Sequence, residues 1–344
     1  MKKERFAFLT LALLSTLNPQ LSTVFAQGSL TPLGPPAPTM KSLDQIEART
    51  PISSAPFTIS SSGSYYLTKN LYVTTGDAIT ITTNQITLDL NGFTISSTAP
   101  SAAGSGILLG PSVTDIAIFN GHIKGGVTNN AGVYIGGGFA NGIYFSGVVA
   151  PWNVQVREVS VSGCLNSGIY IGLVGQVKVV ESCVVRTLGG TGIFASSVSH
   201  CTARDCGDTG ILADTASDCS AYSASGPGIS AGTAVNCYGQ SVSGQGITGG
   251  SASNCRGFSI SSQGISAETA SNCYGYSSSN RGIFANAANA CSGHSDGGSY
   301  GLFATSVANT CYGYSFTGTG LNAYIAVGCT GSSVAYSFHY NMPP

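Results

Sequence analysis

The chain has 344 residues, of which only 8% are charged, and its formal net charge is −1. So sparse and balanced a charge excludes the basic surface that binding to nucleic acid or to an anionic membrane requires. Glycine is abundant, but aliphatic residues and cysteines recur in register, which indicates a packed domain rather than a disordered chain.

The first 26 residues have the pattern of an export signal. A basic start, Lys2-Lys3-Glu4-Arg5, precedes an apolar run of about a dozen residues, and Val24-Phe25-Ala26 provides a small-residue cleavage site. The run is too short to cross a bilayer. We therefore expect cleavage near Ala26 and a mature protein that is secreted, periplasmic or held at the cell surface, without a membrane span.

Residues 27–56 are rich in proline, which predicts a linker or an extended arm. From residue 57 to residue 340 the composition is uniform, and we expect one elongated domain. Apolar residues in 63–95 alternate as in β-strands, and the pattern breaks at Asn91-Gly92. We expect the same strand pattern to continue in the segments 116–126, 132–136, 142–145, 154–164 and 167–172.

The C-terminal half repeats with a fixed period. Coils such as GITGGSASNCRGFSISSQ at 246–263 and GISAETASNCYGYSSSNR at 264–281 open on glycine and are 18 residues long. Strict coils of this kind run from about residue 192 to residue 338. Such a period is typical of a solenoid, in which each coil stacks on the previous one. Ten of the eleven cysteines mark it: Cys164, Cys183, Cys201, Cys219, Cys237, Cys255, Cys273, Cys291, Cys311 and Cys329.

The cysteines share a strand parity with columns of isoleucine, of alanine or glycine, and of serine. Side chains of one parity point to one side of a strand, so we expect these columns to face the interior. Parallel stacking holds neighbouring Cβ atoms farther apart than a disulfide favours, and we predict free buried thiols that act as small apolar fillers. Cys206 lies outside the column and is the one thiol that we single out as reactive.

A polar column precedes the cysteines, and its side chains suit a turn in which each copy contacts the next. Its members are His200, Asp218, Asn236, Asn254 and Asn272.

The N-terminal half resembles the right-handed parallel β-helix proteins of the pectin-lyase-like group. The resemblance rests on GDAITITTNQITLDLNGFTI at 76–95, on IFNGHIKG at 118–125 and on the recurring GIYF and GIYI strands. It implies a single-stranded right-handed parallel β-helix over most of the chain beyond residue 57. The alternative is a left-handed β-helix, which also has 18-residue coils but requires an aliphatic residue every six positions. The right-handed fold hosts lyases, hydrolases, epimerases and adhesins, so the resemblance implies no single activity.

Enzymes of the resembled fold use clustered acids with calcium and an arginine, or aspartates on adjacent coils. The densest group of this kind here gives weak catalytic candidates, namely Arg204, Asp205, Asp208, Asp214, Asp218 and His200. Paired carboxylates serve acid–base glycoside chemistry, and several together can hold calcium. A polysaccharide lyase or glycoside hydrolase is thus the alternative function. Calcium belongs to the lyase alternative alone; otherwise we expect no cofactor and no metal.

Aromatic side chains occupy outward positions one and three residues after the cysteines. They form two adjacent columns, with Tyr238, Arg256, Tyr274 and Tyr312 in one and Tyr222, Phe258, Tyr276 and Tyr314 in the other. Exposed rings with polar tips are typical of binding surfaces, and a polysaccharide or another cell-surface component is the partner that we expect. The alternative is that the rings stack on one another and merely cover the sheet.

A regular array of hydroxyl groups, as in Thr215-Ala216-Ser217 and Thr269-Ala270-Ser271, is similar to the flat faces of β-solenoid ice-binding proteins. This resemblance gives a third hypothesis. The sequence favours an exported, non-catalytic β-solenoid that serves as a binding or structural module for carbohydrate.

Overall fold

A computed structural model describes residues 47–172 and 177–340. Residues from Arg49 onward form one compact unit. The predicted signal peptide and most of the predicted arm lie outside the described residues, although the last part of that arm contains the first strand, β1 (Thr50–Ile52). Within the described ranges, no helix has the length and hydropathy needed to span a bilayer.

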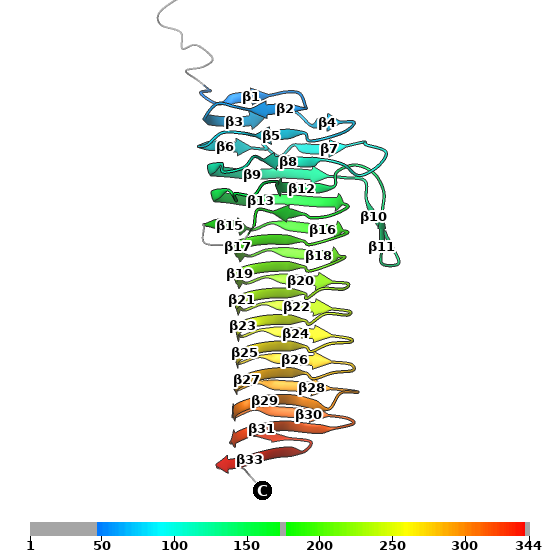
Figure 1. Cartoon of the computed structure of the whole chain (residues 1–344), viewed down its shortest axis with the longest axis vertical. Coiled ribbons are helices and arrows are strands. Elements are labelled where there is room, and N and C mark those ends of the chain that lie inside the picture. The colour runs from blue at the N-terminus through cyan, green and yellow to red at the C-terminus, as the bar shows by residue number, and fades with distance from the viewer. Residues whose placement is uncertain (1–46, 173–176, 341–344) are drawn as a thin grey trace, which may run out of the picture. The chain divides into compact units, whose positions relative to one another are not determined.

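The compact unit is a parallel β-helix, as the sequence predicts, and its coils stack one below the other (Figure 1). The right-handed sense of the helix stays a prediction. In the N-terminal half the strands are β1, β2 (Phe57–Ile59), β3 (Gly63–Leu67), β4 (Leu71–Val73), β5 (Ile79–Ile81), β6 (Ile86–Asp89), β7 (Thr94–Ser97), β8 (Ser105–Leu109), β9 (Thr114–Lys124), β12 (Asn141–Phe145), β13 (Trp152–Cys164), β14 (Ile169–Tyr170), β15 (Lys178–Glu181) and β16 (Val184–Leu188).

In the C-terminal half each coil contributes a longer and a shorter strand. The longer strands are β17 (Ile193–Ser199), β19 (Ile211–Ser217), β21 (Ile229–Val235), β23 (Ile247–Ser253), β25 (Ile265–Ser271), β27 (Ile283–Asn289), β29 (Tyr300–Asn309), β31 (Thr319–Val327) and β33 (Val334–Tyr340). The shorter strands are β18 (Thr202–Cys206), β20 (Ser220–Ser223), β22 (Tyr238–Ser241), β24 (Arg256–Ser259), β26 (Tyr274–Ser277), β28 (Ser292–Ser295), β30 (Tyr312–Ser315) and β32 (Thr330–Gly331).

The register between coils follows the sequence period. Ile229 pairs with Ile247, and Ile247 pairs with Ile265 in the next coil. These isoleucines are buried, as are the alanines two residues later in most coils. Each buried isoleucine contributes roughly 1.5–3 kcal/mol, so a single coil cannot stand alone and stability comes from stacking.

The cysteine column faces the interior. All eleven cysteines are buried and free of disulfides. Burial raises the pKa of the Cys164 thiol to about 12. Cys206 is a correction to the sequence analysis, because it is fully buried and burial raises the pKa of its thiol to about 12. A thiol with those properties is protonated and inaccessible, which opposes the reactivity that we expected.

The polar column forms the predicted turn ladder. His200, Asp218 and Asn236 all have φ between +53° and +54°, in the left-handed region that asparagine and aspartate tolerate. The Asn236 amide donates to Asp218 Oδ1 over 3.1 Å, and the Asn254 amide donates to Asn236 Oδ1 over 3.2 Å. The ladder therefore fixes the corner before each cysteine.

A serine column closes the next turn from the inside. The Ser241 hydroxyl donates to the carbonyl of Gly226 over 2.7 Å and accepts a hydrogen bond from the Gly244 N–H over 2.8 Å. The same pair of bonds recurs at Ser259 and Ser277. Buried hydroxyls are thus fully used to hold the loops that lead to the next coil.

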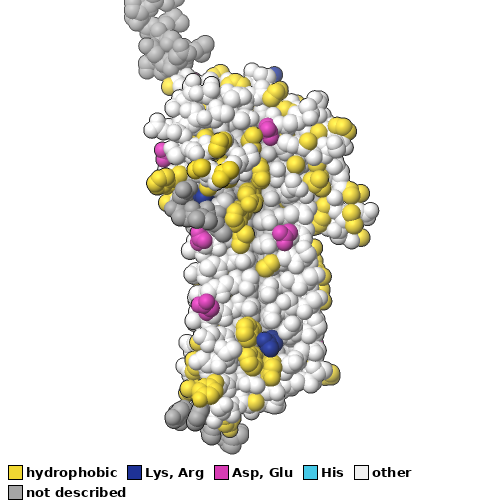
Figure 2. Space-filling view, in the orientation of Figure 1, with side chains coloured by type: hydrophobic (Ala, Val, Ile, Leu, Met, Phe, Trp, Pro, Cys, Tyr) yellow, Lys and Arg dark blue, Asp and Glu magenta, His cyan; other side chains and the backbone are white. Residues whose placement is uncertain are grey.

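One element departs from the coils. β10 (Thr128–Asn130) and β11 (Val133–Ile135) form an antiparallel hairpin that projects from the side of the helix (Figure 1). The sequence analysis expected 132–136 to be a coil strand, and this expectation is wrong. Val133 and Ile135 are 61% and 51% exposed, so the apolar alternation of this segment does not face the interior. The face displayed in Figure 2 carries few charged side chains, in line with the composition.

Candidate functional site

The strongest candidate is the predicted row of rings, which we call the aromatic strip. It lies on the outer face of the shorter strands from β20 to β30 and consists of Tyr222, Tyr238, Arg256, Phe258, Tyr274, Tyr276, His294, Tyr312 and Tyr314. The two predicted columns are in register between coils. Tyr238 pairs with Arg256 and Arg256 with Tyr274, while Phe258 pairs with Tyr276 in the neighbouring column.

The rings contact one another along the helix axis. The ring centroids of Phe258 and Tyr276 are 5.9 Å apart, and those of Tyr276 and His294 are 5.4 Å apart. Contacts between Tyr238 and Phe258 at 5.4 Å and between His294 and Tyr314 at 4.8 Å extend the row in both directions. These distances are typical of attractive aromatic pairs, so the strip is continuous over five coils.

The strip combines buried ring edges with accessible faces. Tyr238 is 38% exposed and Tyr312 46% exposed, whereas Phe258, Tyr274 and Tyr276 are half-buried. Packing between rings therefore explains part of the arrangement, as the alternative interpretation requires. The remaining exposure leaves a shallow apolar surface of constant width, with tyrosine hydroxyls along it.

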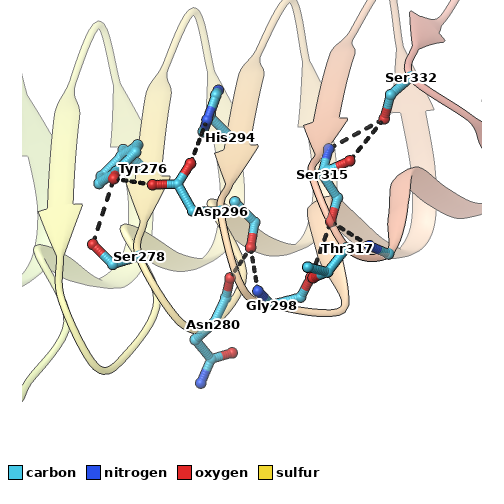
Figure 3. A network of polar contacts seen from close by, with 11 residues as sticks. Tyr276, Ser278, Asn280, His294, Asp296, Gly298, Ser315, Thr317 and Ser332 are labelled. Carbon is cyan, nitrogen blue, oxygen red and sulfur yellow. Dashed lines mark hydrogen bonds and ion pairs between the residues drawn. The ribbon is translucent and has the colours of Figure 1, made fainter.

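A carboxylate fixes the lower part of the strip. Asp296 accepts a hydrogen bond from the Tyr276 hydroxyl, and His294 Nε2 lies 2.9 Å from its Oδ1 atom (Figure 3). Hydrogen bonds from Tyr276 and then from His294 hold the pKa of Asp296 below its ordinary value, and the same bond raises the pKa of Tyr276. Ser278 donates to the Tyr276 hydroxyl from the other side. The orientation of the Tyr276 ring is thus set before any ligand arrives.

The column of Phe258 and Tyr276 continues toward the N-terminus as a row of cations. Lys124 pairs with Ser162, Ser162 with Arg186, and Arg186 with Arg204, and the next position along is Tyr222. Lys124, Arg186 and Arg204 are exposed. We call these three residues the cation column.

The hairpin stands beside the cation column and is tied to it through one carboxylate. Asp205 Oδ1 accepts hydrogen bonds from the Tyr134 hydroxyl over 2.9 Å and from the Asn129 amide over 2.6 Å. Glycines make this approach possible, because a Cβ atom at Gly207 would lie 3.0 Å from Tyr134 Cε2 and one at Gly189 would lie 3.2 Å from Tyr134 Cβ.

Two hollows meet at Asp205. The first has a volume of about 430 Å³ and is lined by Lys124, Asn129, Arg186 and Asp205, among others. The second has a volume of about 610 Å³, and its lining includes Arg204, Asp205, Tyr222, Tyr238 and Gln240. Together they form a groove that leads from the hairpin to the upper end of the aromatic strip.

The structure does not bring the six catalytic candidates together. Arg204 and Asp205 line the groove, and Asp208 lies in the following loop, where Thr191 donates to it over 3.5 Å. Asp214 lines a separate hollow together with Lys178. His200 and Asp218 belong to the turn ladder, with His200 Nε2 3.9 Å from Asp218 Oδ2. Within the described ranges, no group of three His, Cys, Asp or Glu residues is arranged to hold a metal ion.

Sequence reasoning missed a second row of rings on another face. Tyr144, Tyr170 and Phe194 follow the isoleucine column on β12, β14 and β17, with ring centroids 5.4 and 4.7 Å apart. The recurring tripeptides Gly-Ile-Tyr and Gly-Ile-Phe carried the signal, because the residue after a buried isoleucine must point outward. The cation column and the hairpin were missed as well, since neither follows the 18-residue period.

No family model, curated protein or solved structure matches the chain.

Proposed function

We propose that the protein is an exported β-solenoid module that binds a polysaccharide along its aromatic strip and does not catalyse a reaction. The observation that carries this proposal is the continuity of the ring row over five coils, from Tyr238 to Tyr314. The signal-like N-terminus supports a role outside the cytoplasm, where such a ligand would be met.

The strip suits a linear sugar chain for geometric reasons. Parallel coils repeat every 4.8 Å or so, which places one outward ring at each step along the axis. Apolar ring faces can pack against the C–H faces of successive sugars, while hydroxyls such as that of Tyr238 offer hydrogen bonds at the edges. The backbone ladder holds these rings in place beforehand, so little conformational freedom is lost on binding.

The proposal is tested by pull-down of the mature chain with insoluble polysaccharides. Replacing Tyr274 and Tyr276 by alanine removes the centre of the strip and is expected to reduce retention about tenfold, which corresponds to 1.4 kcal/mol. The matched control replaces Tyr144 and Tyr170 by alanine, because these rings form a similar pair on another face. Equal retention by both double variants, with circular dichroism showing that both are folded, would overturn the proposal.

A polysaccharide lyase or glycoside hydrolase is the second candidate function. Asp205 favours it, since this carboxylate lies in the groove beside Tyr134 and Arg204. Glycoside hydrolysis ordinarily needs two carboxylates about 5–9.5 Å apart. Asp205 is the sole carboxylate that lines either hollow among the described residues, which weighs against this mechanism. Incubation of every retained polysaccharide with the wild-type chain and with Asp205→Asn, followed by assay of new ends, decides between binding and turnover.

The ice-binding hypothesis depends on the hydroxyl array of the longer strands. Thr215 pairs with Thr233 and Ser251 with Thr269, but the next partner of Thr269 is Ala287. The array is therefore shorter than the aromatic strip. Absence of thermal hysteresis in a solution of the mature chain would remove this hypothesis.

A further inference from the structure

The cation column concentrates positive charge in a molecule that has little of it. Charged side chains make up 8% of the sequence and are sparse on the surface shown in Figure 2. Lys124, Arg186 and Arg204 nevertheless occupy one column on nearby coils, with only Ser162 between the first two. Arg186 and Arg204 are direct partners in the parallel register, so their guanidinium groups start from strand positions about 4.8 Å apart.

This charge is not neutralised within the described part of the chain. The ion pairs found there join Arg49 to Asp89, His200 to Asp218 and His294 to Asp296, and none involves the cation column. Two like charges side by side repel each other, and nothing in the packing of exposed side chains compensates for this cost. An arrangement of this kind is stabilised when an anion binds between the cations.

Asp205 is the carboxylate closest in sequence to the cation column, and its hydrogen bonds show what it does. Its Oδ1 atom accepts hydrogen bonds from Asn129 and Tyr134 and so holds the hairpin against the face of the helix. The hairpin then forms one wall of the first hollow, and Lys124 and Arg186 form the opposite side. The carboxylate shapes the groove, while the cations remain open to a ligand.

We propose that this groove is an anion-binding subsite and that the polysaccharide bound by the aromatic strip carries oxyanion groups, namely carboxylate, sulfate or phosphate. This inference rests on the proposed function. Arginine binds such groups through two parallel hydrogen bonds, and the neighbouring Arg186 and Arg204 suit charges repeated along a chain. The same chain continues past Tyr222 onto the rings, where its uncharged faces pack.

The experiment compares the retention of the full mature chain on three immobilised polysaccharides: a neutral glucan, a uronic acid polymer and a sulfated galactan. The test variant is Arg186→Gln/Arg204→Gln. The matched control is Lys69→Gln/Arg157→Gln, which removes two exposed cations elsewhere and lowers the net charge equally. We expect the test variant to lose at least tenfold in affinity for a charged polymer at low salt, and the control to change less than twofold.

The arms also distinguish the source of the charge. Binding to a uronic acid polymer should weaken below about pH 4, where carboxylates become protonated, whereas binding to a sulfated polymer should not. Equal losses in the test and control variants would mean that only net charge matters and would overturn the subsite. Preference for the neutral glucan, with loss on removal of Tyr274 and Tyr276, would also overturn the subsite but leave the proposed function intact. Retention that is insensitive to the strip variants would reject the proposed function itself.

Discussion

Gly257 offers a direct test of how closely the coils pack. It is one of the small residues that follow the cysteines on the inside of the helix. A Cβ atom at this position would lie 2.1 Å from the carbonyl oxygen of Gly264 and 2.5 Å from Cγ1 of Ile265. Non-bonded heavy atoms normally stay about 3.5 Å apart, so Gly257→Ala creates an overlap of more than an ångström with the next coil.

Overlap of this kind costs about 1–3 kcal/mol, because the ladder hydrogen bonds resist a shift of the neighbouring strand. The expected fall in the midpoint of thermal unfolding is roughly 5–10 °C for 2–3 kcal/mol in a domain of this size. The assay is thermal and urea unfolding followed by circular dichroism.

Gly250→Ala is the matched control, since it makes the same chemical change in the same coil. A methyl group there meets the carbonyl oxygen of Gly232 at 2.9 Å and no second neighbour as closely. Asp214 and Glu268, at the equivalent positions of other coils, already carry side chains. We expect the control to stay within about 0.5 kcal/mol of the parent. If Gly257→Ala is as stable as the control, the tight approach between the coils is refuted.

Three further predictions concern the interior columns and the turns. Ser259→Ala removes both hydrogen bonds of a buried hydroxyl, including the one to the carbonyl of Gly244, and should lower the urea unfolding free energy by about 1–3 kcal/mol; an unchanged midpoint would contradict it. Asn236→Ala should destabilise by about 1 kcal/mol while Asn236→Gly is nearly neutral, because φ is +54°; equal unfolding free energies would contradict this. Cys164 and Cys206 should resist a thiol reagent at pH 8 in the native state and react in guanidinium. Their pKa values rise from 9.0 to about 12 on folding, so stability is retained below pH 9 and falls between pH 9 and 12 by about 1.4 kcal/mol per pH unit for each thiol; a flat pH profile of urea unfolding over that range would contradict the assignment.

The interior and the turns could be predicted from the sequence because they obey its period. An 18-residue repeat in parallel register places Cys237 beside Cys255 and Asn236 beside Asn254, so one alignment of the coils gives each residue its neighbours. Alternation along each strand then decides which columns are buried. The outward position of Tyr274 and Tyr276 followed from the inward position of Cys273 by the same rule.

The groove could not be predicted in this way because it depends on contacts outside the period. Val133 and Ile135 alternate like a buried strand, yet they lie in a hairpin that is fixed by a bond between Tyr134 and Asp205, 71 residues apart. The register of Lys124 with Arg186 depends on coils of unequal length. Such pairings require the three-dimensional arrangement, since no repeat in the sequence marks them.

The central claim is that a polysaccharide lies along the stacked coils and contacts one ring after another. Titration calorimetry with a retained polysaccharide, cut into oligosaccharides of increasing length, tests this most directly. The account predicts that affinity rises with each added sugar until the oligosaccharide spans about five coils, because each step reaches a further ring of the strip. An affinity that is already maximal for a mono- or disaccharide, or that is unchanged by Tyr274→Ala/Tyr276→Ala at every length, would contradict it.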